Sequence, residues 1–430
     1  MRVFVKSFGC STNLADGEVL AGCLAEAGHQ LTKSPSEAEI IIYNTCAVKG
    51  PTENRMIEIL RRAPPEKKLV VAGCLPLINF ERLTGEVGFD GVVGPAAGSS
   101  IVDIVARVSK GEKIREIENS LESLPALNLP RVQVNRVISI VPINYGCLGS
   151  CAYCCVTFAR GRLRSYGPEE IVERVKKDLT LGIREFWLTS QDTACYGRDR
   201  QTNLAELLDA VCGIKGEFKV RVGMMTPNTA LNILKELVEA FRDNHVFKFV
   251  HLPIQSGDNE ILRKMYRHYS VEDFKKTIRV FRKSLPDVTL STDVICGFPG
   301  ESDKAFKKTL QVIEEVSPDI VNVSKFFARP RTAAAEMSRD FVPLQEIKRR
   351  STAAAALAKK VSLEKNRQWI GWNGEIIIDE VGKVSGSWIG RNFAYKPIVV
   401  KSRKKLLGKT LQMKVVRAFQ THLESEIVED

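Results

Sequence analysis

The stretch NYGCLGSCAYCC, residues 144–155, holds four of the chain's eleven cysteines. Cys147, Cys151 and Cys154 have the spacing C-x3-C-x2-C. A zinc site usually takes its fourth ligand from a second C-x2-C pair, and none follows this motif. A thiol redox pair would leave Cys147 unused, and ferredoxin patterns supply four cysteines. The spacing therefore favours a four-iron cluster on three thiolates, with one iron left open to hold a substrate or cofactor.

The motif lies in a segment with repeated β/α character, which we place at residues 137–340. Six short apolar runs alternate there with helical patterns: ISIVPI, REFWLT, KVRVGM, FKFVHLPI, VTLSTDVI and IVNVSKFF. Six such units predict an open, partial (β/α)6 barrel of the TIM type. The cysteine motif follows the first of these strands directly. We therefore expect it at the C-terminal mouth, where such barrels carry out their chemistry.

Residues 1–105 are predicted to form an α/β domain with a mostly parallel sheet, followed by a charged connector over residues 106–136. RVFVKS, EIIIYN and KLVVAG are short β-branched runs, each followed by a helical pattern. Cys10, Cys46 and Cys74 each follow the end of one of these runs, so parallel pairing would bring them to one edge of the sheet. There they could hold a second cluster, or they could be three small buried hydrophobic residues.

The C-terminal part is predicted to be a basic helix over residues 341–369 and a small all-β barrel over residues 370–430. The barrel is predicted by four short alternating strands separated by turns: EIIIDEV, GRNFAYKPIVV, TLQMKVVRAF and HLESEIV. The chain carries a net charge of +12, and residues 401–417 contain seven Lys or Arg and no acidic residue. Such charge can serve solubility alone, but nucleic acid is the leading specific partner.

Several residues are candidates for RNA binding. The arginines of ARGRLR could contact phosphates or could pair with acidic side chains. Trp388, Phe393 and Tyr395 could stack on bases or fill the core of the small barrel. The basic candidates are Arg160, Arg162, Arg164, Arg391, Lys396, Arg403, Lys404 and Lys405.

Composition points to a globular protein in a reducing compartment. Of the 430 residues, 44% are apolar and 27% are charged, which is ordinary for a soluble chain of about two or three domains. No apolar run approaches the roughly 18 residues that span a bilayer, and the start MRVFVKSFGC is not a signal peptide. We expect a cytoplasmic protein without a membrane contact, in which an odd number of reduced cysteines forms no disulfide framework.

Together these motifs resemble a known enzyme family over nearly the full length of the chain. SFGCSTNLADGE, YNTCAV, VAGCLP, NYGCLGSCAYC, WLTSQDTACYGRD, TDVICGFPGES and GRNFAYKPIVV resemble the methylthiotransferases, radical S-adenosylmethionine (SAM) enzymes that act on tRNA or a ribosomal protein. The strings are most similar to the archaeal and eukaryotic branch, which makes 2-methylthio-N6-threonylcarbamoyladenosine beside the tRNA anticodon. The resemblance implies an N-terminal methylthiotransferase domain, a radical SAM core and a C-terminal TRAM RNA-binding module.

The resemblance also implies the cofactors and partners. Two 4Fe–4S clusters are expected, one on Cys147, Cys151 and Cys154 and one on the three N-terminal cysteines. In the family, SAM bound at the open iron of the first cluster yields a 5′-deoxyadenosyl radical, and the second cluster provides the methylthio group for C2 of the adenosine. Expected partners are the tRNA anticodon stem–loop, an electron donor such as a ferredoxin or flavodoxin, and a sulfur source. Alternatives are another tRNA base, a ribosomal-protein aspartate, or an iron–sulfur RNA-binding protein without catalysis.

Residues at the strand ends are candidates for the SAM pocket. The family places groups that bind the methionine amino end of SAM in the segment LTSQD. Gly297 and Gly300 would let the backbone approach the ligand, or would form a plain turn. His251 and Cys155 are interpreted as structural, as are Cys23, Cys195, Cys212 and Cys296. The SAM candidates are Tyr153, Ser190, Gln191, Asp192, Gln255, Ser256, Thr292, Asp293, Gly297 and Gly300.

Overall fold

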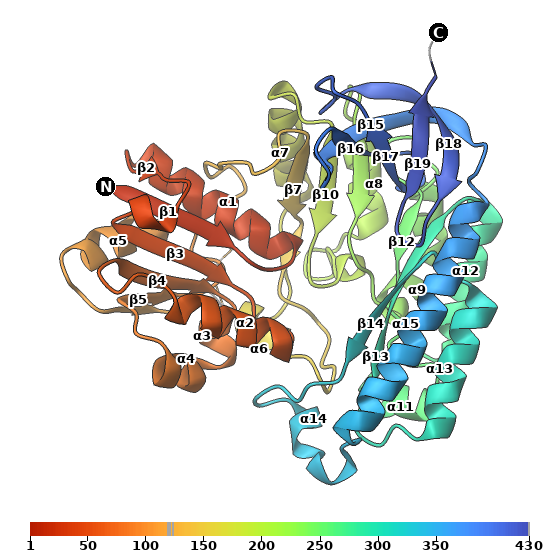
Figure 1. The fold of residues 1–430 in the computed structure, drawn as a ribbon, viewed down its shortest axis with the longest axis horizontal. Coiled ribbons are helices and arrows are strands. Elements are labelled where there is room, and N and C mark those ends of the chain that lie inside the picture. Colours follow the sequence, from red (N-terminus) through yellow and green to blue (C-terminus); the bar gives the residue numbers. More distant parts are fainter. Residues whose placement is uncertain (118–121, 123, 429–430) are drawn as a thin grey trace.

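The N-terminal part forms a parallel sheet covered by helices on both faces (Figure 1). The computed structural model describes residues 1–117, 122 and 124–428. Along β3, Ile40 and Ile42 pack with α1 and α5, whereas Ile41 packs with α2 and α4, as strand alternation requires. The strand order is β2-β1-β3-β4-β5-β6, with β1 Arg2–Ser7, β2 Gln30–Leu31, β3 Ile40–Thr45, β4 Lys68–Gly73, β5 Gly91–Val93 and β6 Ile114–Glu116. The helices are α1 Ser11–Glu26, α2 Gly50–Arg61, α3 Leu75–Ile78, α4 Phe80–Glu86 and α5 Ile101–Ser109.

The expected limit of this sheet at residue 105 lies inside α5. Ile101, Ile104, Val105 and Val108 form a helical stripe, and all four are buried against the sheet. The chain then returns as β6, which pairs in parallel with β5. The first part of the expected connector therefore belongs to the N-terminal sheet. Residues 118–121 and 123 of that connector, and residues 429–430 of the C-terminal module, lie outside the described residues.

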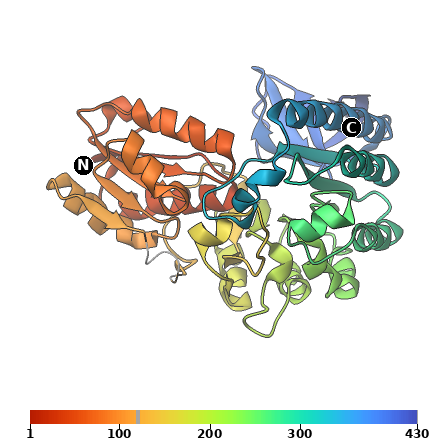
Figure 2. The same ribbon diagram turned by 90° about the horizontal axis from the view of Figure 1, so that it is seen from below.

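The central part is the expected partial barrel of parallel strands (Figures 1 and 2). Two three-stranded sheets, β11-β10-β7 and β12-β13-β14, are joined by a parallel bridge between Met224 and His251. The strands are β7 Ile138–Pro142, β10 Glu185–Thr189, β11 Lys219–Val222, β12 Phe249–His251, β13 Thr289–Cys296 and β14 Ile320–Lys325, and a short hairpin pairs β8 Asn144–Tyr145 with β9 Arg164–Ser165.

Helices follow these strands, and most of them cover the outside of the partial barrel (Figures 1 and 2). They are α6 Val156–Arg160, α7 Pro168–Thr180, α8 Leu204–Cys212, α9 Pro227–Leu231, α10 Leu234–Ala240, α11 Asn259–Lys264, α12 Val271–Ser284, α13 Asp303–Val316, α14 Ala333–Glu336 and α15 Leu344–Arg367. The long basic helix α15 packs along α13 and β14 (Figure 1). No helix among the described residues is both long and apolar enough to cross a bilayer.

The last part is a closed five-stranded barrel, as expected. Its strand order is β15-β16-β17-β19-β18, with β15 Asn373–Val381, β16 Ser387–Arg391, β17 Pro397–Lys401, β18 Thr410–Ala418 and β19 Leu423–Ile427. The segment GRNFAYKPIVV, which the alternating pattern predicts to be one strand, is broken between β16 and β17. The Asn392 side chain accepts hydrogen bonds from the backbone of Ala394 and Lys396, and Tyr395 adopts a φ of 59°. This asparagine turn replaces the strand.

This turn fastens the small barrel to the partial barrel. The ring of Tyr395 lies 4.8 Å from that of Phe247 and 5.2 Å from that of Phe249, at the start of β12. The Nζ of Lys396 lies 2.6 Å from Asp319, which precedes β14. The C-terminal module therefore docks at the beginning of the central strands. The N-terminal domain meets their opposite ends, where Ser11 of α1 hydrogen-bonds Thr189 of β10 at 2.6 Å.

Candidate active site

A cavity of about 650 Å³ lies where the N-terminal domain meets the C-terminal ends of the central strands. Cys10, Cys46 and Cys74 directly follow β1, β3 and β4, and the parallel pairing of these strands brings the three positions to one edge, as predicted. The loop from β8 to α6 carries the other three cysteines. All six line the same cavity: Cys10, Cys46, Cys74, Cys147, Cys151 and Cys154.

The N-terminal cysteines form a group of soft ligands in a largely buried setting. Cys46 and Cys74 are buried, and Cys10 is exposed. Burial raises the pKa of Cys74 to about 12, against the opposing charge of Arg160 and with smaller contributions from Cys46 and Cys10. Burial also raises the pKa of Cys46, so the thiols of Cys46 and Cys74 are neutral in the metal-free chain, and binding a cluster would release their protons.

Two of the three loop cysteines, Cys147 and Cys151, lie around Gly149. The backbone N–H of Gly149 donates to the Sγ of Cys147 at 3.2 Å. A Cβ at this position would lie 3.3 Å from the Sγ of Cys147 and 3.6 Å from the Sγ of Cys151, so the glycine keeps the space between the sulfur atoms free. Burial raises the pKa of Cys147 to about 11. Cys154 lines the same cavity, and three such thiols match the ligands of an iron–sulfur cluster.

Arg160 is part of a buried network instead of an RNA-binding surface. Its guanidinium donates to Asp16 at 2.6 Å, and the hydroxyl of Tyr145 donates to the other oxygen of Asp16. All three side chains are buried. The network links α1 of the N-terminal domain to the loop that carries Cys147 and to α6. The alternative of pairing with an acidic side chain is thus the correct one for Arg160. Arg162 is exposed, and Arg164 donates to the carbonyl of Arg160.

Six of the expected SAM residues line the cavity: Tyr153, Ser190, Gln191, Asp192, Gln255 and Asp293. Asp192 accepts hydrogen bonds from the backbone of Ala194 and Thr226 and from the Thr229 hydroxyl, and so ties the loop after β10 to the loop after β11. Burial raises its pKa despite these hydrogen bonds. The Oε1 of Gln191 is buried and has no hydrogen-bond partner among the described residues.

Gln255, which follows β12, and Asp293 of β13 both lie at the cavity. Gln255 has a φ of 69°, an unfavourable conformation for a residue with a side chain, and its backbone bonds to β13 on both sides. Asp293 pairs with His251 at 2.9 Å and with Asn322 at 2.7 Å. Burial opposes ionisation of Asp293, but these hydrogen bonds outweigh it, and the pKa of Asp293 is lowered.

Four expected SAM residues lie outside the cavity lining: Ser256, Thr292, Gly297 and Gly300. Thr292 bonds to the backbone of Leu252 and Ile254, and Ser256 is buried beside Asp258. A Cβ on Gly297 would lie 2.3 Å from Ile347, so this glycine admits α15. Gly300, with a φ of 77°, forms a turn beside Lys264. The plain-turn alternative describes both glycines.

Arg267 is a cavity residue that sequence reasoning missed. It lies in the loop between α11 and α12, donates to the hydroxyl of Tyr153 at 2.5 Å and stacks on the rings of Tyr153 and Tyr269. Arg221 on β11 and Arg198 after β10 also line the cavity. In the sequence, Arg221 and Arg198 could be suspected only because each lies close to the end of a predicted strand.

Comparison with known proteins agrees with this architecture. Residues 141–313 match the radical SAM superfamily, and residues 2–94 match the uncharacterized protein family UPF0004. The chain is 40% identical over 430 residues to a probable threonylcarbamoyladenosine tRNA methylthiotransferase of Pyrococcus horikoshii, covering 100% of both chains. It is 32% identical over 436 residues to the human threonylcarbamoyladenosine tRNA methylthiotransferase, covering 100% of this chain and 74% of the human one. The chain belongs to the radical SAM methylthiotransferase family.

The fold of this methylthiotransferase extends to more distant enzymes. The radical SAM methyltransferase TsrM from Kitasatospora setae superposes with a TM-score of 0.57 at 13% identity, covering 94% of this chain and 80% of that one. This similarity concerns the fold alone. Membership of the radical SAM superfamily implies one 4Fe–4S cluster and SAM as cofactors.

The basic candidates of the C-terminal module fall into two groups. Lys396 is buried in its pair with Asp319, and Arg391 is paired with Asp379 and Glu380. Neither side chain is free to contact a phosphate, because each neutralises a carboxylate at the interface with the partial barrel. The exposed candidates are Arg403, Lys404 and Lys405. Tyr395 neither is free to stack on a base nor fills the core of the small barrel, because its ring packs between the small barrel and the partial barrel.

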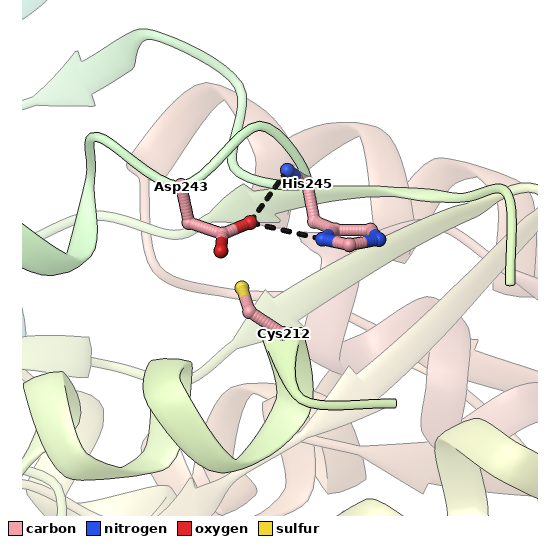
Figure 3. A group of neighbouring side chains, drawn as sticks. All are labelled: Cys212, Asp243 and His245. Atoms are coloured by element: carbon pink, nitrogen blue, oxygen red, sulfur yellow. Dashed lines mark hydrogen bonds and ion pairs between the residues drawn. The ribbon is translucent and has the colours of Figure 1, made fainter. Parts of the chain in front are cut away.

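The remaining cysteines of this methylthiotransferase lie away from the cavity lining. Cys155 is buried in the core below α6. Cys212 lies close to Asp243 and His245 in a group with three possible metal ligands (Figure 3). In this group Asp243 accepts hydrogen bonds from both the backbone and the ring of His245, at 2.8 and 2.9 Å. The ammonium of Lys248 bonds to the Asp243 carbonyl at 2.6 Å, and such a nearby cation opposes binding of a metal ion.

Proposed function

We propose that this methylthiotransferase acts on tRNA and converts N6-threonylcarbamoyladenosine, next to the anticodon, into 2-methylthio-N6-threonylcarbamoyladenosine. Relatives aligned along the whole chain bear the name of this activity. One structural observation carries the proposal: both groups of three cysteines open into a single cavity between two domains. A base held there is within reach of both.

The cysteines would hold two clusters. Cys147, Cys151 and Cys154 would hold the one that binds SAM, and the N-terminal group would hold the second. When bound, these groups supply the electron that cleaves SAM to a 5′-deoxyadenosyl radical and the methylthio group that C2 of the adenosine receives. The protein contributes position, because holding reacting groups at contact distance can lower the barrier by several kcal/mol, about 7–11 in well-oriented cases.

The cavity residues would orient SAM and keep water out. The Oε1 of Gln191 is a buried, unpaired acceptor suited to the amino group of SAM. Asp192 fixes the loop that carries Ser190 and Gln191, because it holds three donors on two neighbouring loops. Arg267 fixes the ring of Tyr153 beside Cys154 by a hydrogen bond and by stacking. A rigid wall restricts the radical to the bound base.

The substrate and the other partners follow from charge and from the family. Exposed Arg162 near the cavity and Arg403, Lys404 and Lys405 on the small barrel would bind the tRNA backbone. Membership of the family implies two further partners, namely an electron donor such as a ferredoxin or flavodoxin and a source of sulfur. The tRNA partner region would be the anticodon stem–loop.

Nucleoside mass spectrometry of tRNA from a strain that lacks the gene tests the proposal. We expect the 2-methylthio nucleoside to disappear and N6-threonylcarbamoyladenosine to accumulate. Complementation with the wild-type gene restores the modification, and complementation with a Cys74→Ala gene does not. Unchanged modification in a strain without a second such gene contradicts the proposal.

A further inference from the structure

Arg221 occupies an unusual position on the inner face of the partial barrel. It lies on β11 directly beside Trp187 of β10, and its side chain lines the cavity. Its guanidinium carbon lies 5.0 Å from the ring centre of Trp187, 5.1 Å from that of Phe249 and 5.3 Å from that of Tyr395. The aromatic rings hold the guanidinium in place below the rim of the cavity.

This cation has no anionic partner among the described residues. Its Nε is buried without a hydrogen-bond partner, and the guanidinium makes no ion pair with a carboxylate in the described part of the chain. Among the other cavity arginines, Arg160 is paired with Asp16, and Arg198 is exposed. Arg267 also has a buried Nε without a hydrogen-bond partner, but its guanidinium already donates to the hydroxyl of Tyr153. A half-buried, fixed guanidinium without a counter-ion is a receptor for an anionic group of a ligand.

The proposed reaction brings two carboxylates to the cavity. The carboxylate of SAM is expected on the open iron near Cys147, Cys151 and Cys154. The threonine of the substrate nucleoside, joined to N6 of the adenine through a carbonyl, carries the second. We propose that Arg221 binds this threonyl carboxylate and makes the enzyme select the threonylcarbamoylated base. This inference rests on the proposed function. A planar carboxylate matches the guanidinium fork, and the side chain of Arg221 lines the cavity.

Selectivity follows from the burial of the cation. A substrate without the carboxylate leaves the guanidinium desolvated and unpaired. This lowers the binding free energy far more than the loss of a contact in water would. A site of this kind rejects an analogue that lacks the bonding group strongly. Unmodified adenosine at the same tRNA position would thus be a poor substrate.

Two synthetic anticodon stem–loops test the inference, one carrying N6-threonylcarbamoyladenosine and one carrying its methyl ester, which is uncharged. We expect wild-type enzyme to prefer the acid by about 30-fold or more in kcat/KM. Arg221→Met should lose most of this preference because its rate on the acid falls, and Arg221→Lys should keep part of it. The ratio within one enzyme preparation does not depend on how much of the protein is folded. Arg279→Met, on the exposed side of α12, is the matched control and should keep the wild-type ratio.

The outcomes separate the inference from the function. A wild-type preference that survives in Arg221→Met, or that disappears in Arg198→Met instead, overturns the role of Arg221. Equal losses on acid and ester also overturn it, because they indicate a purely structural residue. If wild-type enzyme methylthiolates neither stem–loop, the proposed function fails and the inference fails with it.

Discussion

At the scale of single residues, the cavity cysteines form two groups of three, one in the N-terminal domain and one in the loop after β8, and each group is proposed to hold its own cluster. Removing one ligand from either set should remove that cluster and spare the other. We expect about eight irons per reconstituted wild-type chain and about four in Cys151→Ala and in Cys74→Ala. Cys151→Ala should also lose 5′-deoxyadenosine formation, whereas Cys74→Ala should keep it.

Iron and sulfide analysis after anaerobic reconstitution, together with chromatography of 5′-deoxyadenosine, checks this expectation. Cys155→Ala is the control, because Cys155 is buried away from the cavity lining. A wild-type value near four irons would show that only one of the two sets holds a cluster.

The buried pair of Asp16 and Arg160 should matter for stability. Asp16→Ala leaves a buried guanidinium uncompensated, which typically costs about 3–5 kcal/mol. Glu58→Ala removes an exposed pair with Arg62 and should cost less than about 1 kcal/mol. Chemical denaturation of both variants measures the difference. Equal effects would mean that the buried pair is no more important than a surface one.

At the scale of elements, a buried acid on β10, Glu185, lies close to the acidic side chain of Asp379 on β15. Burial, and then the charge of Asp379, raises the pKa of Glu185 from 4.5 to about 8. A group whose pKa is higher in the folded state stabilises that state fully at pH values below the pKa of the unfolded state. This contribution is lost as pH rises through the pKa of the folded state. Wild-type stability should therefore fall between about pH 4.5 and 8 relative to Glu185→Gln, by roughly 1–3 kcal/mol.

Melting temperatures at pH 5 and pH 8.5 check this expectation. Glu185→Gln should melt higher than wild type at pH 8.5, and the gap should shrink or reverse at pH 5. The control Glu239→Gln changes a carboxyl on the exposed side of α10 and should show no such gap. A pH-independent difference would contradict the raised pKa.

Most elements could be predicted from the sequence because their signals are local. The β/α alternation predicts the N-terminal sheet and the partial barrel, and the strand ends predict the positions of all six cavity cysteines. The pairing of Arg160 with Asp16 and the docking of Tyr395 join segments that are far apart in the chain, so no local sequence pattern predicts these contacts. The break at Asn392 was missed because the flanking residues alternate as in a strand, whereas side-chain hydrogen bonds to the backbone decide the conformation.

At the scale of the whole molecule, exposed basic residues should give salt-dependent binding of tRNA. Neutralising three such residues that contact phosphates removes the release of about two to three counterions, so the slope of log Kd against log salt should fall by roughly that number. The test variant changes Arg403, Lys404 and Lys405 to Gln. The control changes three exposed residues of the N-terminal domain to Gln, namely Lys33, Lys110 and Lys113.

Fluorescence anisotropy of labelled tRNA over a series of salt concentrations measures both slopes. An unchanged slope in the variant of Arg403, Lys404 and Lys405 would show that this loop between β17 and β18 does not contact the tRNA. A loss in the control variant alone would place the contact on the N-terminal domain.

The central claim is that two clusters act on one base inside one cavity between the domains. Purified protein, reconstituted anaerobically and incubated with SAM, a reductant and a stem–loop carrying N6-threonylcarbamoyladenosine, tests it most directly by mass spectrometry of the nucleosides. The account predicts the 2-methylthio nucleoside with wild type and none with either Cys151→Ala or Cys74→Ala. Product formed by the Cys74→Ala protein, or wild-type cleavage of SAM without any methylthio product, would contradict it.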